Sequence, residues 1–392
     1  MLKSIEMPKL RKVVPYLLLI FCCAIAFTSG YFVRTILDVP DHFKLLNEAY
    51  RLLETHYIEA LPPRLTLQRG MVQGMLEALD DPYTQYVEPE EHAIQADTLA
   101  GEYGGIGALV TTDGQGQFFL APFPEGPAAE AKLPEGTLLL AIDGSPLSNG
   151  ITLENVVGHL RGPIDTLVRI RIRRPSAGQA AEINLTRANI PLPSVTEYRL
   201  PGYDEVGVVA VSVFSEKTSS EVHAAIEKLV DRGIGYLILD LRNNGGGLLE
   251  SAVQVSRIFL RTGIIVSEER RGEIRQTYEA QTAGTHVDIP VAIVVDKTTA
   301  SAAEVVAAAL QANNRALLVG DQTFGKGSVQ VIVELSDGSS MRITSSRWIN
   351  PAGEELDEAG LTPDILLDPE SAGTESALFR SAELLIEGNY PE

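Results

Sequence analysis

The sequence predicts a mixed α/β fold, in which helices pack on a partly parallel sheet, a smaller α+β unit is inserted, and a membrane-anchor helix comes first. Three observations predict it. A long uncharged segment follows a basic N-terminus, short alternating strands cluster in a glycine-rich stretch, and continuous apolar strands alternate with helices after residue 201. With 392 residues, the chain is long enough for two or three domains.

The N-terminal segment 13–33 contains 21 residues without a charge, preceded by four basic residues: Lys3, Lys9, Arg11 and Lys12. A helix of that length spans the ~30 Å hydrocarbon core of a bilayer. Basic flanks stay in the cytoplasm, so we expect residues 1–12 there, a single-pass signal anchor at 13–33, and the remaining chain outside the cell membrane.

A cleaved signal peptide is the alternative, because Ala24-Ile25-Ala26 has the small-x-small form of a cleavage site. The product would then be secreted or periplasmic. The two cysteines, Cys22 and Cys23, both lie in this segment, so we expect no disulfide framework in the exported part.

Residues 34–100 are predicted to form an N-terminal helical region, because apolar residues recur there at three- and four-residue spacing. Residues 101–189 change to glycine-rich loops and short strands, with strands expected at 117–120, 138–142 and 167–173 and a helix at 153–160. Pro191 and Pro193 mark the boundary of this unit.

Residues 190–370 alternate apolar strands with helices, which is typical of a covered, partly parallel sheet. Strands are expected at 236–241, 291–295 and 317–319, and helices at 248–260 and 302–312. A hairpin should join residues 329–335 to 340–348 across Asp337-Gly338, a strong turn signal. Residues 371–392 should form a C-terminal helical tail.

Composition limits the partners. Asp and Glu number 52 against 32 Lys and Arg, a formal net charge of −20. A surface this acidic repels phosphate backbones, so nucleic acid is not an expected partner. The six histidines have no metal-ligand spacing, and we expect neither a metal nor a cofactor.

Three loops follow predicted strands, and the sites of open α/β sheets gather at the carboxyl ends of strands. The glycines at 245–247 could aim backbone N–H groups at an oxyanion or merely connect a strand to a helix. Ser301 should begin the helix at 302–312, where local sequence favours a plain N-cap. Lys326 follows a stretch similar to a phosphate-binding loop, but Gly327 and the strand after it exclude nucleotide binding.

Together these stretches resemble the carboxyl-terminal processing peptidases, serine proteases with a Ser–Lys dyad. Five matches in the family's order carry the resemblance, at residues 81–86, 240–247, 299–304, 324–330 and 351–364. It implies a serine protease core at 190–370, with Ser301 as nucleophile, Lys326 as general base and Gln330 orienting Lys326. The amides of Gly246 or Gly247 and of Ala302 would form the oxyanion hole.

Residues 101–189 resemble the PDZ domain of these peptidases. The resemblance implies that backbone N–H groups of Gly104, Gly105, Ile106 and Gly107 bind the terminal carboxylate of a substrate. Lys132 and Thr137 depart from the family's usual Gly and Asp.

We therefore expect an extracytoplasmic serine endopeptidase that recognises free C-termini of proteins and cleaves near them. The alternative is a catalytically inactive envelope binding protein on the same fold. Helical residues 41–100 and 374–388 could form a homodimer or pack on their own sheet.

Overall fold

A computed structural model describes residue 21 and residues 43–147, 150–176, 178–281, 284–356 and 359–391. Contacts divide the chain into two units, up to Met75 and from Leu76 onward. The first contains α2 (Lys44–His56), which buries none of its residues, and most of α3 (Arg64–Glu77). In the described ranges, no helix combines the length and apolarity that a membrane crossing requires. Except for Phe21, the predicted anchor at 13–33 lies outside the described residues.

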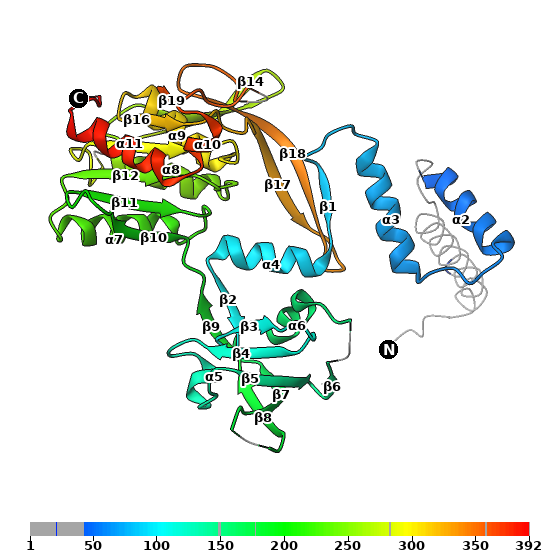
Figure 1. Cartoon of the computed structure of the whole chain (residues 1–392). Coiled ribbons are helices and arrows are strands. Elements are labelled where there is room, and N and C mark those ends of the chain that lie inside the picture. Colours follow the sequence, from blue (N-terminus) through cyan, green and yellow to red (C-terminus); the bar gives the residue numbers. More distant parts are fainter. Residues whose placement is uncertain are drawn as a thin grey trace, which may run out of the picture. The chain divides into compact units, whose positions relative to one another are not determined.

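The second unit contains a six-stranded sheet in the order β10-β11-β12-β15-β16-β19 (Figure 1). Its strands are β10 (Val195–Arg199), β11 (Val206–Val211), β12 (Tyr236–Asp240), β15 (Val291–Val295), β16 (Ala316–Gly320) and β19 (Ile365–Leu366). The β10–β11 pair is antiparallel and every other pair is parallel. The partly parallel sheet predicted from the apolar runs is therefore present.

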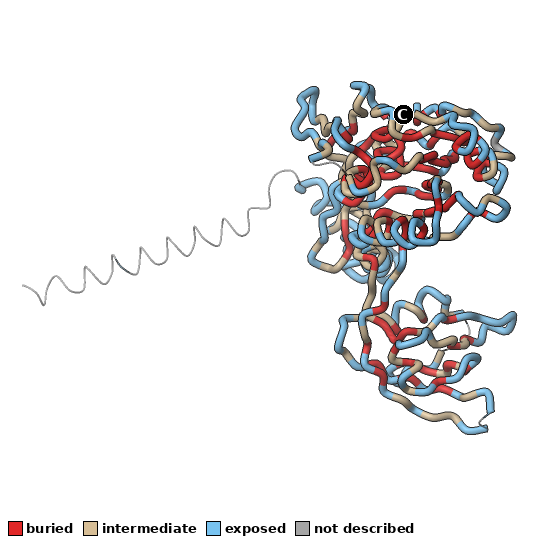
Figure 2. The backbone as a smooth tube through the Cα atoms, turned by 90° about the vertical axis from the view of Figure 1, so that its left-hand side faces the viewer, coloured by how far each residue is buried: buried red, intermediate tan, exposed pale blue. Residues whose placement is uncertain are grey.

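Helices cover both faces of this sheet, which explains why its strands are apolar on both sides. On one face pack α7 (Thr218–Val230), α8 (Leu249–Phe259) and α9 (Ala302–Ala312), together with Leu237 and Leu239 of β12. On the other face, Ile238 packs against α11 (Glu375–Ile386), which follows the short α10 (Pro369–Ala372). Figure 2 shows the buried residues concentrated in this three-layer core.

A second, antiparallel sheet adjoins the first. It consists of β1 (Gln85–Val87), β13 (Ile264–Arg270), β14 (Glu273–Glu279), β17 (Ser328–Glu334) and β18 (Ser340–Ile349), with β18 pairing β1, β13 and β17. The predicted hairpin is the β17–β18 pair. After β1 comes α4 (Pro89–Ala100), which ends at Gly101 in the left-handed conformation.

Residues 102–191 form a smaller unit with a hydrophobic core of its own. The paired strands β2 (Glu102–Gly105) and β9 (Ala188–Pro191) lead into and out of it. Its antiparallel sheet has the order β3-β4-β5-β7-β8, with β6 paired to β5. The elements are β3 (Ala108–Thr112), β4 (Phe118–Pro122), α5 (Pro127–Glu130), β5 (Thr137–Ile142), β6 (Ser145–Pro146), α6 (Leu153–Leu160), β7 (Leu167–Arg173) and β8 (Ala181–Thr186).

Candidate active site

Two loops meet at the carboxyl edge of the core sheet because the strands before them are parallel neighbours. Asp240 at the end of β12 lies opposite Val294 of β15. The loop after β12 contains the glycines 245–247, and the loop after β15 ends at Ser301. Asn244 joins them: its carbonyl accepts from the Ala300 N–H at 2.9 Å, and its buried side chain donates to Val211 O at 2.9 Å.

Ser301 occupies the N-cap position of α9 with φ 55° and ψ −118°. A residue with a β-carbon adopts this conformation at a cost of roughly 1–3 kcal/mol, so the surrounding structure must hold it there. Glu304 in the first turn of α9 provides one such constraint, because its Oε2 accepts from the Ser301 N–H at 2.8 Å. The predicted N-cap position is thus confirmed, and it is strained.

Glu304 is fully buried and connects the Ser301 loop to the Lys326 loop. Besides the Ser301 N–H, its carboxylate accepts from the Thr323 hydroxyl at 2.6 Å, the Gly325 N–H at 2.8 Å and the Lys326 N–H at 2.9 Å. A buried carboxyl group with four donors has its desolvation largely offset by hydrogen bonds. One side chain therefore sets the relative position of two backbone segments.

The Lys326 amine lies in a partly buried site near the start of β17. Its Nζ donates to Gln330 Oε1 at 2.9 Å and lies 5.1 Å from the centroid of the Tyr83 ring. Burial lowers the pKa of the Lys326 ammonium below its ordinary value; the positive charge of Arg342 acts in the same direction, and Asp81 acts against them. The surroundings therefore favour a neutral amine more than water does.

Gln330 is itself held by a segment far away in sequence. Its Nε2 donates to the carbonyl oxygen of Tyr83, just before β1. That segment is fixed in turn, because Asp81 accepts from the Thr84 hydroxyl at 2.6 Å and Thr84 Oγ1 accepts from the Thr344 N–H of β18 at 3.0 Å. Segment 81–86, one of the five motifs found in the sequence, thus holds the Gln330 side-chain amide that positions Lys326.

Of the two glycine amides named as alternatives for the oxyanion hole, Gly246 and Gly247, the structure leaves only one available. The Gly246 N–H donates to Asn244 Oδ1 at 2.8 Å and is already used. Within the described part of the chain, the N–H groups of Gly247 and Ala302 have no acceptor. Gly247 has φ 141°, and a β-carbon there would lie 2.3 Å from Phe214 O, so only glycine fits.

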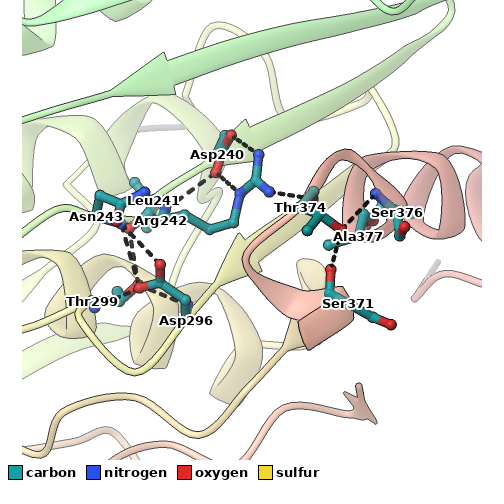
Figure 3. A network of polar contacts seen from close by, with 11 residues as sticks. Asp240, Leu241, Arg242, Asn243, Asp296, Thr299, Ser371, Thr374, Ser376 and Ala377 are labelled. Atoms are coloured by element: carbon teal, nitrogen blue, oxygen red, sulfur yellow. Dashed lines mark hydrogen bonds and ion pairs between the residues drawn. The ribbon is translucent and has the colours of Figure 1, made fainter. Parts of the chain in front are cut away.

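A second carboxylate, that of Asp296, accepts hydrogen bonds from both loops (Figure 3). Asp296, at the end of β15, accepts from the Asn243 N–H at 3.2 Å, from the Thr298 N–H at 2.9 Å and from the Thr299 N–H at 3.0 Å. In the same view, Asp240 pairs with Arg242 at 2.7 Å, and Arg242 donates to Thr374 O at the start of α11. The loop after β12 is therefore tied to the end of β15 and to the face of the sheet that α11 covers.

A cavity of about 390 Å³ brings together five of the six residues predicted for catalysis and the oxyanion hole. These five are Ser301, Lys326, Gln330, Gly246 and Gly247. Among the described residues, no hydrogen bond joins the Lys326 amine to the Ser301 hydroxyl. Hydrogen bonds between a nucleophile and its base commonly tighten when substrate binds.

The predicted carboxylate-binding residues lie elsewhere, in the smaller unit. Gly104 and Gly105 belong to β2 and pair with β9, whereas Ile106 and Gly107 form the turn before β3.

No group of three or more metal-ligating side chains occurs in the ranges that the structure describes.

The structure brings to this site several groups without a role predicted from the sequence: the Tyr83 carbonyl, Asn244, Asp296 and Arg342. Their roles depend on partners distant in sequence, such as the Gln330–Tyr83 contact across 247 positions. The aspartate at the end of an apolar strand was the one local signal, since such carboxylates commonly accept bonds from the next loop.

Comparison with known proteins identifies similar sequences across most of the chain. Residues 205–367 match the profile of peptidase family S41, and residues 34–91 match the N-terminal domain of the activating protease CtpB. The chloroplastic C-terminal processing peptidase of Tetradesmus obliquus is 33% identical over 83% of this chain and 73% of that protein. The carboxy-terminal-processing protease of Bartonella bacilliformis is 32% identical over 92% of this chain and 83% of that protein. The carboxy-terminal processing protease CtpB of Bacillus subtilis is 32% identical over 82% and 67%.

Proposed function

Since the chain belongs to peptidase family S41 and is a serine-type peptidase of the carboxy-terminal processing group, we propose that it cleaves polypeptides with Ser301 as nucleophile and Lys326 as general base. One observation carries the proposal. The amine of Lys326 is held by Gln330 in the cavity that Ser301 also lines, in surroundings that favour its neutral form.

The proposed reaction needs only these groups and water. Neutral Lys326 takes the proton from the Ser301 hydroxyl as its oxygen attacks the scissile carbonyl. The N–H groups of Gly247 and Ala302 then stabilise the oxyanion, and the positive end of the α9 helix dipole adds to this stabilisation. The Lys326 ammonium returns the proton to the leaving amine. The same amine then takes a proton from water, whose oxygen attacks the acyl carbonyl, and the ammonium returns that proton to the Ser301 oxygen as the bond to the new C-terminus breaks.

Gln330 suits the task of orienting this base because it has no charge. Its Oε1 accepts from Nζ, and its Nε2 is anchored on the Tyr83 carbonyl, so the amine has a defined position. A carboxylate in the same place would stabilise the ammonium and oppose proton uptake. The amide thus fixes geometry without raising the pKa of Lys326.

We further propose that residues 101–189 act as a PDZ-type unit that binds substrate C-termini. In support, β3 is an edge strand of its sheet and pairs only with β4 among the described strands. An extended peptide could add to its free edge, and the turn at Ile106 and Gly107 could supply N–H groups to the terminal carboxylate.

For location, the proposal is a membrane-anchored protein with its peptidase core outside the cytoplasm, or its secreted or periplasmic form after cleavage. The basic residues before the 21 uncharged positions of 13–33 support it. Self-association is a second part of the proposal, supported by α2, whose Leu45, Leu46, Leu52 and Leu53 are all exposed.

Labelling with a fluorophosphonate probe tests the nucleophile. We expect the wild-type chain to be labelled and to cleave a peptide with a free C-terminus, and Ser301→Ala to do neither. Ser212→Ala is a matched control, because Ser212 lines the same cavity but bonds to Ser194 O at 3.1 Å. Absence of labelling and cleavage in the wild type would instead favour an inactive binding protein.

A further inference from the structure

The active-site cavity differs in charge from the rest of the chain. The whole sequence has a formal net charge of −20, yet none of the described residues that line this cavity is an aspartate or glutamate. Its two charged residues are both basic, Lys326 and Arg342. When Lys326 acts as a base it is neutral, so Arg342 then provides the sole formal charge in the lining.

Arg342 faces the cavity because of its register in the second sheet. It lies on β18 directly opposite Ile332 of β17, and Gln330, two residues earlier on β17, lies opposite Thr344. Residues opposite each other, and residues two apart on one strand, share a face of a sheet. Arg342 and Gln330 therefore project to the same side, and both line the cavity.

The guanidinium group of Arg342 is only partly satisfied. One nitrogen, Nη2, donates to Gln95 Oε1 of α4 at 2.5 Å. The Nε atom is buried and lacks a hydrogen-bond partner, and Arg342 forms no ion pair with the carboxylates that the structure describes. An unpaired buried donor on a charged group is unfavourable, and the guanidinium as a whole keeps donor capacity for an anion in the cavity.

We propose that Arg342 binds a carboxylate of the polypeptide substrate inside the active-site cavity. The proposal rests on the proposed peptidase function and adds to it a preference at the site of cleavage. A guanidinium offers parallel N–H donors that match the two oxygens of a carboxylate. That carboxylate is either an Asp or Glu side chain near the scissile bond or the substrate's own C-terminus.

The electrostatic surroundings support this assignment. The positive charge of Arg342 is felt inside the cavity, where it lowers the pKa of the Lys326 ammonium. A substrate carboxylate beside Arg342 would enter a cavity without competing acids, whereas most of the acidic surface would repel it. Arg342 would therefore recognise a carboxylate at one position of the bound substrate, and not acidic polypeptides in general.

Paired fluorogenic peptides test the proposal. One set places Asp or Asn at each of three positions on either side of the cleaved bond, and a second set ends in a free acid or an amide. We expect kcat/KM of the wild type to favour the carboxylate member of at least one pair by about 10-fold or more. The pair that shows the preference identifies the source of the carboxylate.

Three variants assign that preference to Arg342. In Arg342→Gln the preference should fall to within about 2-fold, and Arg342→Lys should retain part of it. The control is Arg347→Gln, on the same strand but exposed and paired with Glu355 at 3.0 Å, which should keep the full preference. Equal turnover of both members by the wild type, or an unchanged preference in Arg342→Gln, overturns the proposal.

A binding measurement separates this proposal from the peptidase function itself. If the wild type cleaves no peptide, the proposed function fails, but calorimetry on Ser301→Ala can still compare the two members of each pair. Tighter binding of the carboxylate member, lost when Arg342→Lys or Arg342→Gln is added, supports the Arg342 site. Equal binding of the two members of every pair to Ser301→Ala refutes the Arg342 site. This comparison needs only a protein that keeps Arg342, so it holds even if Arg342→Gln does not fold.

Discussion

Gln330→Glu should move the pH dependence of cleavage to higher pH. Gln330 Oε1 lies 2.9 Å from Lys326 Nζ, so the substitution places a carboxylate oxygen against the amine. Coulomb's law gives about 6 kcal/mol for two unit charges at this separation with an effective dielectric near 20, and about 1.4 kcal/mol in bulk water. The ammonium is stabilised in either limit, so the pKa of Lys326 rises.

A base must be unprotonated to act, so activity increases as pH passes upward through its pKa. The rising limb of kcat/KM against pH should therefore move alkaline by about 1 to 4 pH units, and by the lower part of that range because Lys326 is only partly buried. The assay is hydrolysis of a neutral fluorogenic peptide from pH 5 to 11. The midpoint is the readout, because loss of the Tyr83 contact lowers only the amplitude.

Val331→Glu is the matched control for this experiment. Val331 is the next residue on β17, is exposed, and points to the other face of the strand. It adds the same charge without contact to Lys326, so its midpoint should stay close to that of the wild type. A midpoint in Gln330→Glu that does not move, or that moves equally in Val331→Glu, would refute the assignment of Lys326 as the base.

Three further outcomes are expected. Glu304→Ala removes the shared acceptor of four donors and should lower the free energy of unfolding in urea by about 3 kcal/mol or more, and a loss under 1 kcal/mol would contradict its role. Gly247→Ala should lower kcat at least about 100-fold because its β-carbon displaces an oxyanion amide, whereas Gly245→Ala, with nothing within 4 Å, should keep most activity. Asp296→Asn retains the Oδ1 acceptor and should keep most activity, while Asp296→Ala should reduce kcat more than it changes KM; equal kinetics of the two variants would argue against the positioning role.

The site is assembled from three loops on two sheets, and two buried acceptors, Glu304 and Asp296, hold the loops in register. The reacting groups therefore need few direct contacts with one another before substrate arrives. Damage to a buried acceptor should consequently reduce stability and turnover together, whereas changes at Gln330 should act mainly on protonation.

Much of the local structure was readable from the sequence. The apolar runs predicted at 236–241 and 291–295 are β12 and β15, the Ala-rich stretch is α9, and the Asp337-Gly338 turn joins β17 to β18. Such elements depend on side-chain periodicity and turn residues, which are properties of neighbours along the chain. The family resemblance likewise rested on short contiguous motifs, and the sequence comparisons confirm it.

Only the tertiary structure decided which groups face one another. Packing brings the Tyr83 carbonyl to Gln330. The Gly246 N–H bonds to Asn244, which leaves the Gly247 N–H for the oxyanion hole. The register of β18 with β17 places Arg342 in the cavity. No local pattern encodes these pairings, because they follow from strand order and register between segments that are far apart in the chain. The residue types that can perform the chemistry are thus a property of the sequence, whereas their mutual distances and charges arise from packing.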